Sequence, residues 1–196
     1  MMEQLSEDIL FYNICYSDYE VSILFSSLCK RFNQISKGYG KELRTPTSFF
    51  LKRIEDVNNY GFKRTYWINK FTNKKEGKCE VWWDNGNKCK ECYYKDGKKQ
   101  RKYESWWKDG TRCTECYFIN GNTEGKYIEW HQGKNGHIHK EYHYKNGKRD
   151  GKHEMWWENG NKRKQCFYVN GKREGVVECW HEDGNRNTLL EQYKNS

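Results

Sequence analysis

A tryptophan recurs through the C-terminal two thirds of the chain at a nearly constant spacing. Successive copies are separated by 24, 24, 26 and 24 residues, at Trp82, Trp106, Trp130, Trp156 and Trp180. The position five residues before each tryptophan is occupied by Gly77, Arg101, Gly125, Gly151 and Gly175. A further glycine follows each tryptophan, and an insertion of two residues displaces it to Gly136 in the third unit. A period of this length is the signature of a repeat architecture, in which each unit packs on its neighbours.

Each unit also carries Asn-Gly or Asp-Gly pairs, such as Asn146-Gly147 and Asn159-Gly160. These dipeptides favour hairpin turns because both residues tolerate positive φ. The segments between them are rich in Tyr, Trp, Phe and Cys and have the length of ordinary strands. We therefore predict a mainly β protein, a single-layer antiparallel meander of stacked hairpins in which each repeat adds about 10 Å of sheet. The five tryptophans are expected to form an aromatic column on one face.

The composition is that of an ordered intracellular protein. Aromatic residues make up 17% of the 196 residues, and disordered chains are poor in such large apolar groups. No run of about 18 apolar residues is present, so no membrane span is expected. The first ten residues, MMEQLSEDIL, lack the basic start and apolar core of a signal peptide. We therefore expect the protein in the cytoplasm, where its nine cysteines would mostly be free thiols.

Two Cys-x-x-Cys pairs, Cys89/Cys92 and Cys113/Cys116, have the ligand spacing of a zinc ribbon. A shift by one repeat, however, aligns the second cysteine of each pair in a mostly apolar column. That column is Cys92, Cys116, Tyr142, Cys166 and Leu190, and the other is Cys89, Cys113, His139, Arg163 and Asn187. Residues three apart on a strand point to opposite faces, so we interpret the cysteines as packing thiols and predict no metal site. The alternative ligands His137, His139 and His143 are interpreted as polar strand positions of the inserted unit.

The repeat unit resembles the MORN repeat, in its looser variant form. Its clearest copy is NGKRDGKHEMWWENG, from Asn146 to Gly160, and the resemblance covers about residues 70–193. The departures are Arg101 in place of glycine, the insertion in the third unit, and His131 and His181 in place of the second tryptophan. The resemblance implies a twisted single sheet with a scaffold role, associated with protein contacts and with acidic membrane lipids.

The charge of the chain is concentrated in the repeats. Residues 1–60 hold seven Lys/Arg and eight Asp/Glu, whereas residues 61–196 hold 29 Lys/Arg and 19 Asp/Glu. One set of hairpin turns carries paired cations, namely Lys74, Lys75, Lys98, Lys99, Lys148, Arg149, Lys172 and Arg173. We expect these turns to form a basic rim on one edge of the sheet, a candidate site for the phosphates of nucleic acid or lipid. The alternative is a set of solvated hairpin tips. A neighbouring column, Glu80, Glu104, Glu154 and Glu178, suggests charge pairing across strands.

The N-terminal region has apolar residues at helical spacing instead. The segments LSEDIL and LFSSLCKRFNQIS resemble the opening and closing blocks of an F-box, within about residues 4–37, with Ser6 where that family usually has proline. This resemblance implies a surface for a Skp-family adaptor. The residues that would supply it are Leu5, Ser6, Ile9, Leu10, Leu28, Cys29 and Phe32. The layout also resembles F-box and repeat proteins of large DNA viruses, which would place the chain in the host cell cytoplasm.

The sequence therefore predicts three regions. Residues 1–37 would be a small α-helical F-box-like domain, residues 38–60 a linker with a short capping helix from Thr47 to Val57, and residues 61–196 the repeat sheet. No P-loop, Gly-x-Ser-x-Gly or His-Glu-x-x-His motif is present, so we expect neither an enzyme nor a cofactor. The predicted function is an adaptor that recruits an unknown target protein, through the sheet, to a Skp/cullin-type ubiquitin ligase. The alternative is a scaffold for protein, anionic lipid or nucleic acid, in which the helices serve only as a cap.

Overall fold

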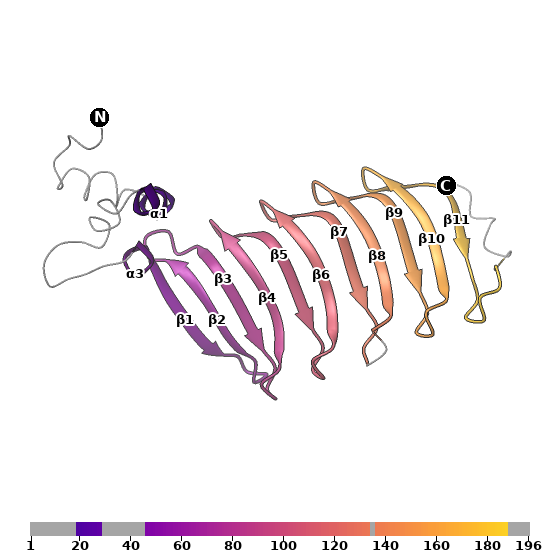
Figure 1. Cartoon of the computed structure of the whole chain (residues 1–196), viewed down its shortest axis with the longest axis horizontal. Coiled ribbons are helices and arrows are strands. Elements are labelled where there is room, and N and C mark those ends of the chain that lie inside the picture. Colours follow the sequence, from indigo (N-terminus) through magenta and orange to yellow (C-terminus); the bar gives the residue numbers. More distant parts are fainter. Residues whose placement is uncertain (1–18, 29–45, 134–135, 188–196) are drawn as a thin grey trace, which may run out of the picture. The chain divides into compact units, whose positions relative to one another are not determined.

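A single antiparallel sheet dominates the computed structural model, which describes residues 19–28, 46–133 and 136–187. Its eleven strands follow one another in sequence order without a crossover, and the sheet is not closed (Figure 1). The strands are β1 (Leu51–Val57), β2 (Lys63–Asn69), β3 (Lys75–Trp82), β4 (Lys88–Lys95), β5 (Lys98–Trp106), β6 (Arg112–Ile119), β7 (Asn122–Trp130), β8 (Ile138–Lys145), β9 (Lys148–Trp156), β10 (Lys162–Val169) and β11 (Lys172–Cys179). The meander predicted from the repeat is confirmed.

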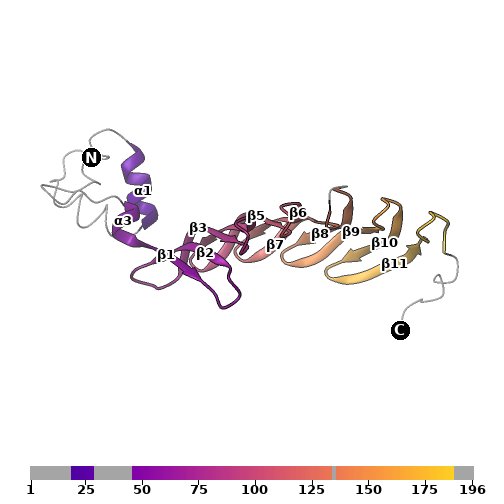
Figure 2. The ribbon, with the colours of Figure 1, turned by 90° about the horizontal axis from the view of Figure 1, so that it is seen from below.

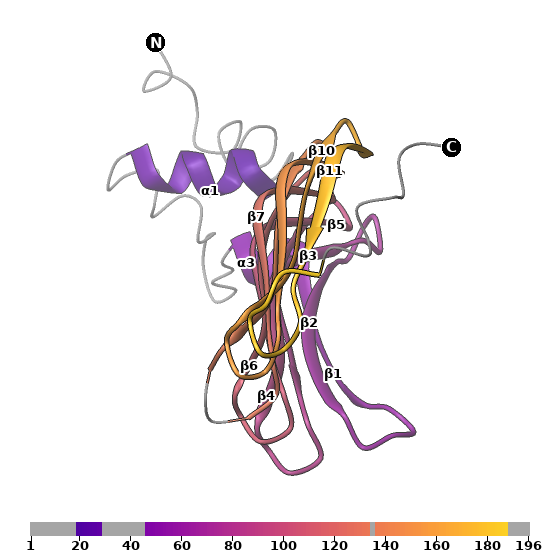
Figure 3. The same cartoon turned by 90° about the vertical axis from the view of Figure 1, so that its right-hand side faces the viewer.

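Each complete repeat forms one hairpin, for example β3–β4 or β9–β10. Figure 2 shows strands β3 to β11 as one layer, with no second layer on either face in this part of the chain. Seen along the sheet, these strands are bent and lie one behind another (Figure 3). Because successive side chains on a strand alternate between faces, each repeat presents the same residues to the same face.

Two helices are described, α1 (Tyr19–Leu28) and α3 (Pro46–Phe50). The capping helix expected from Thr47 to Val57 is wrong, because only its first residues are helical and Leu51–Val57 is the first strand. This strand is the first in the order of the sheet, and its exposed and half-buried residues largely alternate, as expected when one face is more exposed than the other. The predicted α-helical N-terminal domain is not supported either, since α1 is the only helix described within residues 1–37.

The chain divides into two compact units, one of Met1–Arg53 and Trp67–Lys74, the other of Ile54–Tyr66 and Lys75–Ser196. In the first unit α1 contacts α3 through Tyr19 and Phe50, whose ring centroids are 5.9 Å apart. The ring of Phe71 lies 5.9 Å from that of Phe50, which is buried. A small aromatic cluster thus joins the helices to the β2–β3 turn within this unit.

The Asn-Gly and Asp-Gly pairs form two kinds of turn, at opposite edges of the sheet. Four two-residue turns have positive φ at both positions, the geometry of type I′ hairpins. They are Asp96-Gly97, Asn120-Gly121, Asn146-Gly147 and Asn170-Gly171. At the other edge, turns such as Trp83–Asn87 are longer, and only their glycine, here Gly86, has positive φ. All repeats are therefore aligned with the short turns on one edge.

One face of the sheet, which we call the thiol face, holds the most buried side chains. Its central residues lie across from one another in successive hairpins as Cys79 and Cys92, Tyr103 and Cys116, Tyr127 and Tyr142, and His153 and Cys166. The exposed fractions of Cys92, Cys116 and Cys166 are 1%, 2% and 0%. The interpretation of this column as packing thiols therefore agrees with the structure, apart from Leu190, which lies outside the described residues.

Larger rings on the thiol face lie across from the glycine of the adjacent strand. Tyr94 faces Gly77, and Tyr144 faces Gly125. These glycines have φ of 74° and 70°, a left-handed conformation that costs other L-residues roughly 1–2 kcal/mol. Arg101 replaces glycine in the second repeat, yet it adopts the same conformation with φ of 64°. The repeat geometry thus imposes this conformation even where the residue type disfavours it.

Candidate functional site

The opposite face, which we call the ion-pair face, carries three rows of side chains that run across the strands. The first row places a lysine across from an aromatic ring in each hairpin, the second row is mostly glutamate, and the third row holds the repeat tryptophans. The hairpin β3–β4 shows this order as Lys78 across from Tyr93, Glu80 from Glu91, and Trp82 from Lys88. Since β-strands of later repeats keep the same register, the rows continue along the sheet.

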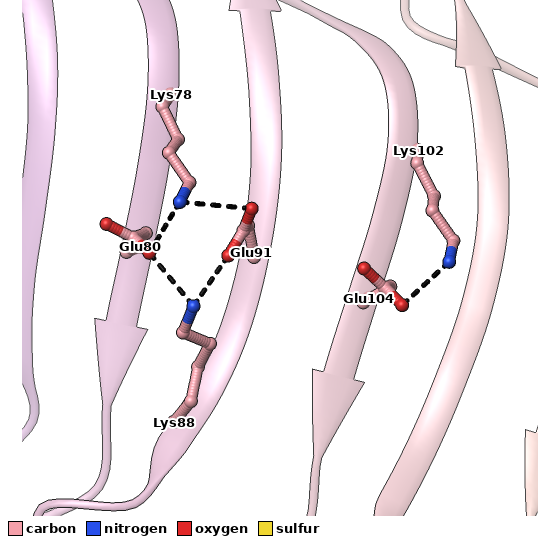
Figure 4. Close-up of polar contacts among 6 residues, drawn as sticks. All are labelled: Lys78, Glu80, Lys88, Glu91, Lys102 and Glu104. Atoms are coloured by element: carbon pink, nitrogen blue, oxygen red, sulfur yellow. Dashed lines mark hydrogen bonds and ion pairs between the residues drawn. The ribbon is translucent and has the colours of Figure 1, made fainter.

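The glutamate row places like charges directly across from each other, which alone would destabilise the sheet. In β3–β4, the Nζ of Lys78 lies 2.8 Å from Glu80 and 3.2 Å from Glu91, and the Nζ of Lys88 lies 2.9 and 2.6 Å from the same carboxylates. Figure 4 shows the two lysines approaching the carboxylates from opposite sides. Burial alone would raise the pKa of the Glu80 carboxyl, but its hydrogen bonds from both lysines lower the pKa below the usual value. Hydrogen bonds to Glu80 and Glu91 raise the pKa of the Lys78 and Lys88 ammonium groups, so these two lysines and Glu80 stabilise one another's charges.

Later repeats keep this arrangement with small changes. Lys102 lies 2.8 Å from Glu104 and 3.1 Å from Glu115, and Lys126 lies 2.9 Å from Glu141. In the fourth repeat Lys152 and Lys162 lie 2.9 and 2.7 Å from Glu154. The sequence identified only one column of glutamates. The second column, Glu91, Glu115 and Glu141, was missed, although its repeat spacing is a signal that could have revealed it.

The five repeat tryptophans occupy equivalent positions at the ends of their strands, and each is half-buried rather than enclosed. Cations lie over several of the rings: the Nζ of Lys88 is 5.7 Å from the ring centroid of Trp106, and the Cζ of Arg112 is 5.7 Å from that of Trp130. Cation–π contacts of this kind contribute about 0.5–1 kcal/mol at exposed sites. The tryptophans therefore form a half-buried row beside the glutamate row rather than a deep core.

In three units the residue after the repeat tryptophan links neighbouring repeats, a role that the sequence did not predict. The indole N–H of Trp83 donates to the carbonyl of Trp106 at 3.1 Å, and that of Trp157 donates to the carbonyl of Trp180 at 3.2 Å. His131 places its Nε2 3.0 Å from the carbonyl of Trp156. The buried indole nitrogen of Trp107 has no hydrogen-bond partner among the described residues. This ladder of bonds is thus interrupted beside the irregular third repeat.

The basic rim separates into two kinds of cation. The first cation of each pair, Lys74, Lys98, Lys148 and Lys172, is exposed at the turn. The second is half-buried between aromatic rings on the thiol face in several repeats. The Nζ of Lys75 lies 4.7 Å from the centroid of the Tyr66 ring and 5.2 Å from that of the Tyr94 ring. Lys99 and Arg149 each likewise place their cation over two aromatic rings. Arg173 is exposed. Three of the eight predicted rim cations, Lys75, Lys99 and Arg149, therefore serve packing as well as charge.

Backbone hydrogen bonds stack the short turns of successive repeats. The amide of Gly97 donates to the carbonyl of Lys75 at 2.9 Å, and the amide of Gly121 donates to that of Lys99 at 2.9 Å. The amide of Gly171 donates to the carbonyl of Arg149 at 2.7 Å. Within the second compact unit, Lys98, Lys148 and Lys172 are thus held on stacked turns along one edge, with a gap at the turn Asn120–Asn122, which lacks cations.

The candidate metal ligands are engaged separately. His137 Nδ1 lies 2.8 Å from the carbonyl of Glu158, His143 Nδ1 lies 3.4 Å from that of Lys152, and the His139 ring lies 4.3 Å from the His131 ring. Within residues 19–28, 46–133 and 136–187, no group of three His, Cys, Asp or Glu side chains could hold a metal ion. Cys92 lies across from Cys79 on the thiol face, whereas Cys89 is half-buried at a strand irregularity.

The adaptor residues Leu5, Ser6, Ile9, Leu10, Cys29 and Phe32 lie outside the described residues. Leu28 is the last residue of α1, and its side chain is not described. The described part of α1 exposes large apolar groups, with exposed fractions of 42% for Ile23 and 65% for Leu24. Neither described helix is long and apolar enough to cross a membrane.

The repeat hairpins match a known family. The model of the MORN repeat variant matches residues 75–96 and 149–170. These two segments correspond to the hairpins β3–β4 and β9–β10 with the longer turns that connect their strands. Two segments of the chain are therefore similar to the MORN repeat variant. This family is generally a binding repeat without enzymatic activity. A search of curated proteins finds no match.

Proposed function

We propose that this chain is a non-catalytic scaffold whose MORN-variant sheet binds a partner macromolecule. The observation that carries the proposal is the open single layer, in which the same polar and aromatic rows recur on the ion-pair face of four successive hairpins. A repeated surface of this kind suits extended contacts better than the enclosed, water-excluding site that catalysis requires.

The same proposal includes a role for the N-terminal region in the cytoplasm, of the host cell if the chain is viral. There the F-box-like segment would bind a Skp-family adaptor and bring the sheet's target to a cullin-type ubiquitin ligase. It is supported by the resemblance of residues 4–37 and by the exposure of Leu24 on α1. If the segment serves only as a cap, the scaffold role of the sheet stands without the ligase.

Calorimetry of the full chain with a Skp-family adaptor tests this role. Fully burying a leucine contributes about 1.5–3 kcal/mol, so two leucines supply a large part of a micromolar affinity of about −8 kcal/mol. We expect Leu10→Glu combined with Leu28→Glu to abolish binding, because both carboxylates would be desolvated without partners. The matched control is Val176→Glu, which introduces the same charge at an apolar residue of β11 that is 60% exposed. Absence of wild-type binding at tens of micromolar would leave only the scaffold role.

A second candidate function is anion binding at the basic rim. It is favoured by the exposure of Lys74 and by the exposure of Lys98, Lys148 and Lys172 on stacked turns at one edge. Binding to vesicles containing phosphatidylserine, or to single-stranded nucleic acid, would weaken steeply with salt if these lysines contact phosphates. Replacing the four lysines with glutamine should then abolish binding while leaving the circular dichroism spectrum unchanged. Salt-independent binding would argue against this use of the rim.

A further inference from the structure

A line of aromatic rings on the ion-pair face has no assigned role. In four successive hairpins a ring lies directly across from a lysine, and the rings are Tyr93, Tyr117, His143 and Phe167. Tyr117 and Phe167 are each 49% exposed, and His143 is exposed as well. We call Tyr117, His143 and Phe167 the aromatic strip. Exposed rings in register over consecutive repeats are unusual, because a sheet gains nothing in stability from leaving them in water.

The lysines beside the strip have their charges directed elsewhere. The Nζ of Lys126 lies 2.9 Å from Glu141, and the Nζ of Lys152 lies 2.9 Å from Glu154, both in the glutamate row. The side chains of these lysines are 51% and 41% exposed. Their methylene stems therefore extend from the strip toward the glutamates. A lysine stem held in this way adds apolar surface between neighbouring rings.

Tyr93 differs from the three rings of the strip. The guanidinium of Arg101, on the adjacent strand, lies 5.7 Å from the centroid of the Tyr93 ring, which is only half-exposed. The equivalent positions in the later repeats are Gly125, Gly151 and Gly175, which have no side chain to cover a ring. A Cβ at Gly151 would lie 3.3 Å from the Cβ of His143. These glycines thus leave the rings of the aromatic strip uncovered. Arg101, by contrast, covers Tyr93 and so excludes that ring from the strip.

We propose that the aromatic strip binds a proline-rich segment of a partner protein in the polyproline II conformation. Rings two strands apart are separated by about 9.6 Å. One turn of a polyproline II helix is three residues and about 9.3 Å long. A proline-rich segment that crosses the strands therefore presents a pyrrolidine ring to each aromatic ring in turn. The preformed helix also loses little conformational entropy on binding.

The hydrogen-bonding groups beside the aromatic strip also favour a proline-rich partner. A polyproline helix has backbone carbonyls but neither N–H donors nor internal hydrogen bonds, so it needs donors from its partner. The Tyr117 hydroxyl can donate a hydrogen bond, and so can the ammonium groups of Lys126 and Lys152, which have three N–H donors each and stay 51% and 41% exposed beside their glutamates.

Fluorescence anisotropy of the full chain with dye-labelled oligoprolines tests the proposal. A proline hexamer spans about 19 Å, the distance from Tyr117 to Phe167, and a nonamer adds one further turn. We expect both to bind, and a glycine-serine nonamer with the same dye not to bind. Tyr117→Ser combined with Phe167→Ser should weaken binding about tenfold or more, since each ring contact accounts for roughly a 2- to 10-fold change. The matched control is Tyr60→Ser, because Tyr60 is an exposed ring outside the strip.

Arg101→Gly provides a test in the opposite direction. Removal of the guanidinium uncovers Tyr93 and lengthens the strip by one ring, so the nonamer should bind about 2- to 10-fold more tightly while the hexamer changes little. The proposal is overturned if oligoproline does not bind at about 1 mM, if the glycine-serine peptide binds equally, or if the double substitution leaves affinity unchanged. It rests on the proposed role of the sheet as a binding surface. Adaptor binding is measured separately through the N-terminal residues. A failure of oligoproline to bind would therefore not decide whether the N-terminal region binds an adaptor.

Discussion

Acidification is expected to destabilise the fourth repeat through His153. This imidazole is 6% exposed, and its Nδ1 lies 3.2 Å from the Sγ of Cys166. Its ring centroid is 4.1 Å from that of Tyr142 and 5.5 Å from that of Tyr168. The Nε2 atom is buried without a hydrogen-bond partner among the described residues. Protonation would therefore place a charge in an apolar site that offers it no acceptor.

The size of the effect follows from the pKa of this group. Burial, and then the charges of Arg149, Lys164 and Lys140, lower the pKa of His153 from 6.5 to about 4. Because the folded state resists protonation of His153, the protein keeps its full stability above the pKa of this group in the unfolded chain. That stability is lost as the pH falls toward the pKa of His153 in the folded protein. At about pH 4.5 the loss amounts to about 2–2.5 kcal/mol, given 1.36 kcal/mol per pKa unit.

Urea unfolding at about pH 7.5 and about pH 4.5, followed by tryptophan fluorescence, measures this loss. The matched variant is His153→Tyr, since tyrosine occupies the equivalent positions 103 and 127. Carboxyl groups with lowered pKa, such as those of Glu80 and Glu154, also destabilise the folded state on acidification, but equally in both proteins. The difference between the proteins isolates His153. An equal loss of stability in both would show that the imidazole does not remain neutral in the fold, and the reasoning would be refuted.

Four further predictions concern single features of the repeats. Gly125→Ala should cost about 1–2 kcal/mol in urea unfolding because φ is 70°, and an unchanged midpoint would mean that the backbone relaxes. Lys78→Met with Lys88→Met should cost about 1–2 kcal/mol at low salt and less at high salt, because Glu80 and Glu91 would then repel each other; equal costs at both would exclude that cause. Trp130→Ala should cost about 2 kcal/mol, less than the 3–5 kcal/mol of a fully buried site, because its ring is half-buried. Elemental analysis should find well under one zinc per chain, and stoichiometric zinc lost on Cys89→Ser would contradict the packing role of the cysteines.

The architecture of the sheet could be predicted because its signals are local and repeated. The tryptophan period and the Asn-Gly pairs lie within a few residues of the turns that they specify, and each recurs in several units. The burial of Cys92 and Cys116 followed from the same alignment, since a shift by one repeat preserves the face. The error at Leu51–Val57 arose where the repeat no longer helps. A single short segment is compatible with helix or strand until a neighbouring strand provides backbone partners.

The sequence by itself therefore determined the meander, the positions of its turns and the burial of its thiol column. Only the tertiary structure decided which side chains meet across strands. The hydrogen bond from Trp83 to Trp106 and the cover of Arg101 over Tyr93 both depend on neighbours in the adjoining strand or repeat. The packing role of Lys75, Lys99 and Arg149 in the basic rim likewise became known only from the aromatic rings beside them. The physical reason is that periodicity specifies the face and row of a residue, whereas bulges and rotamers select the atoms that it contacts.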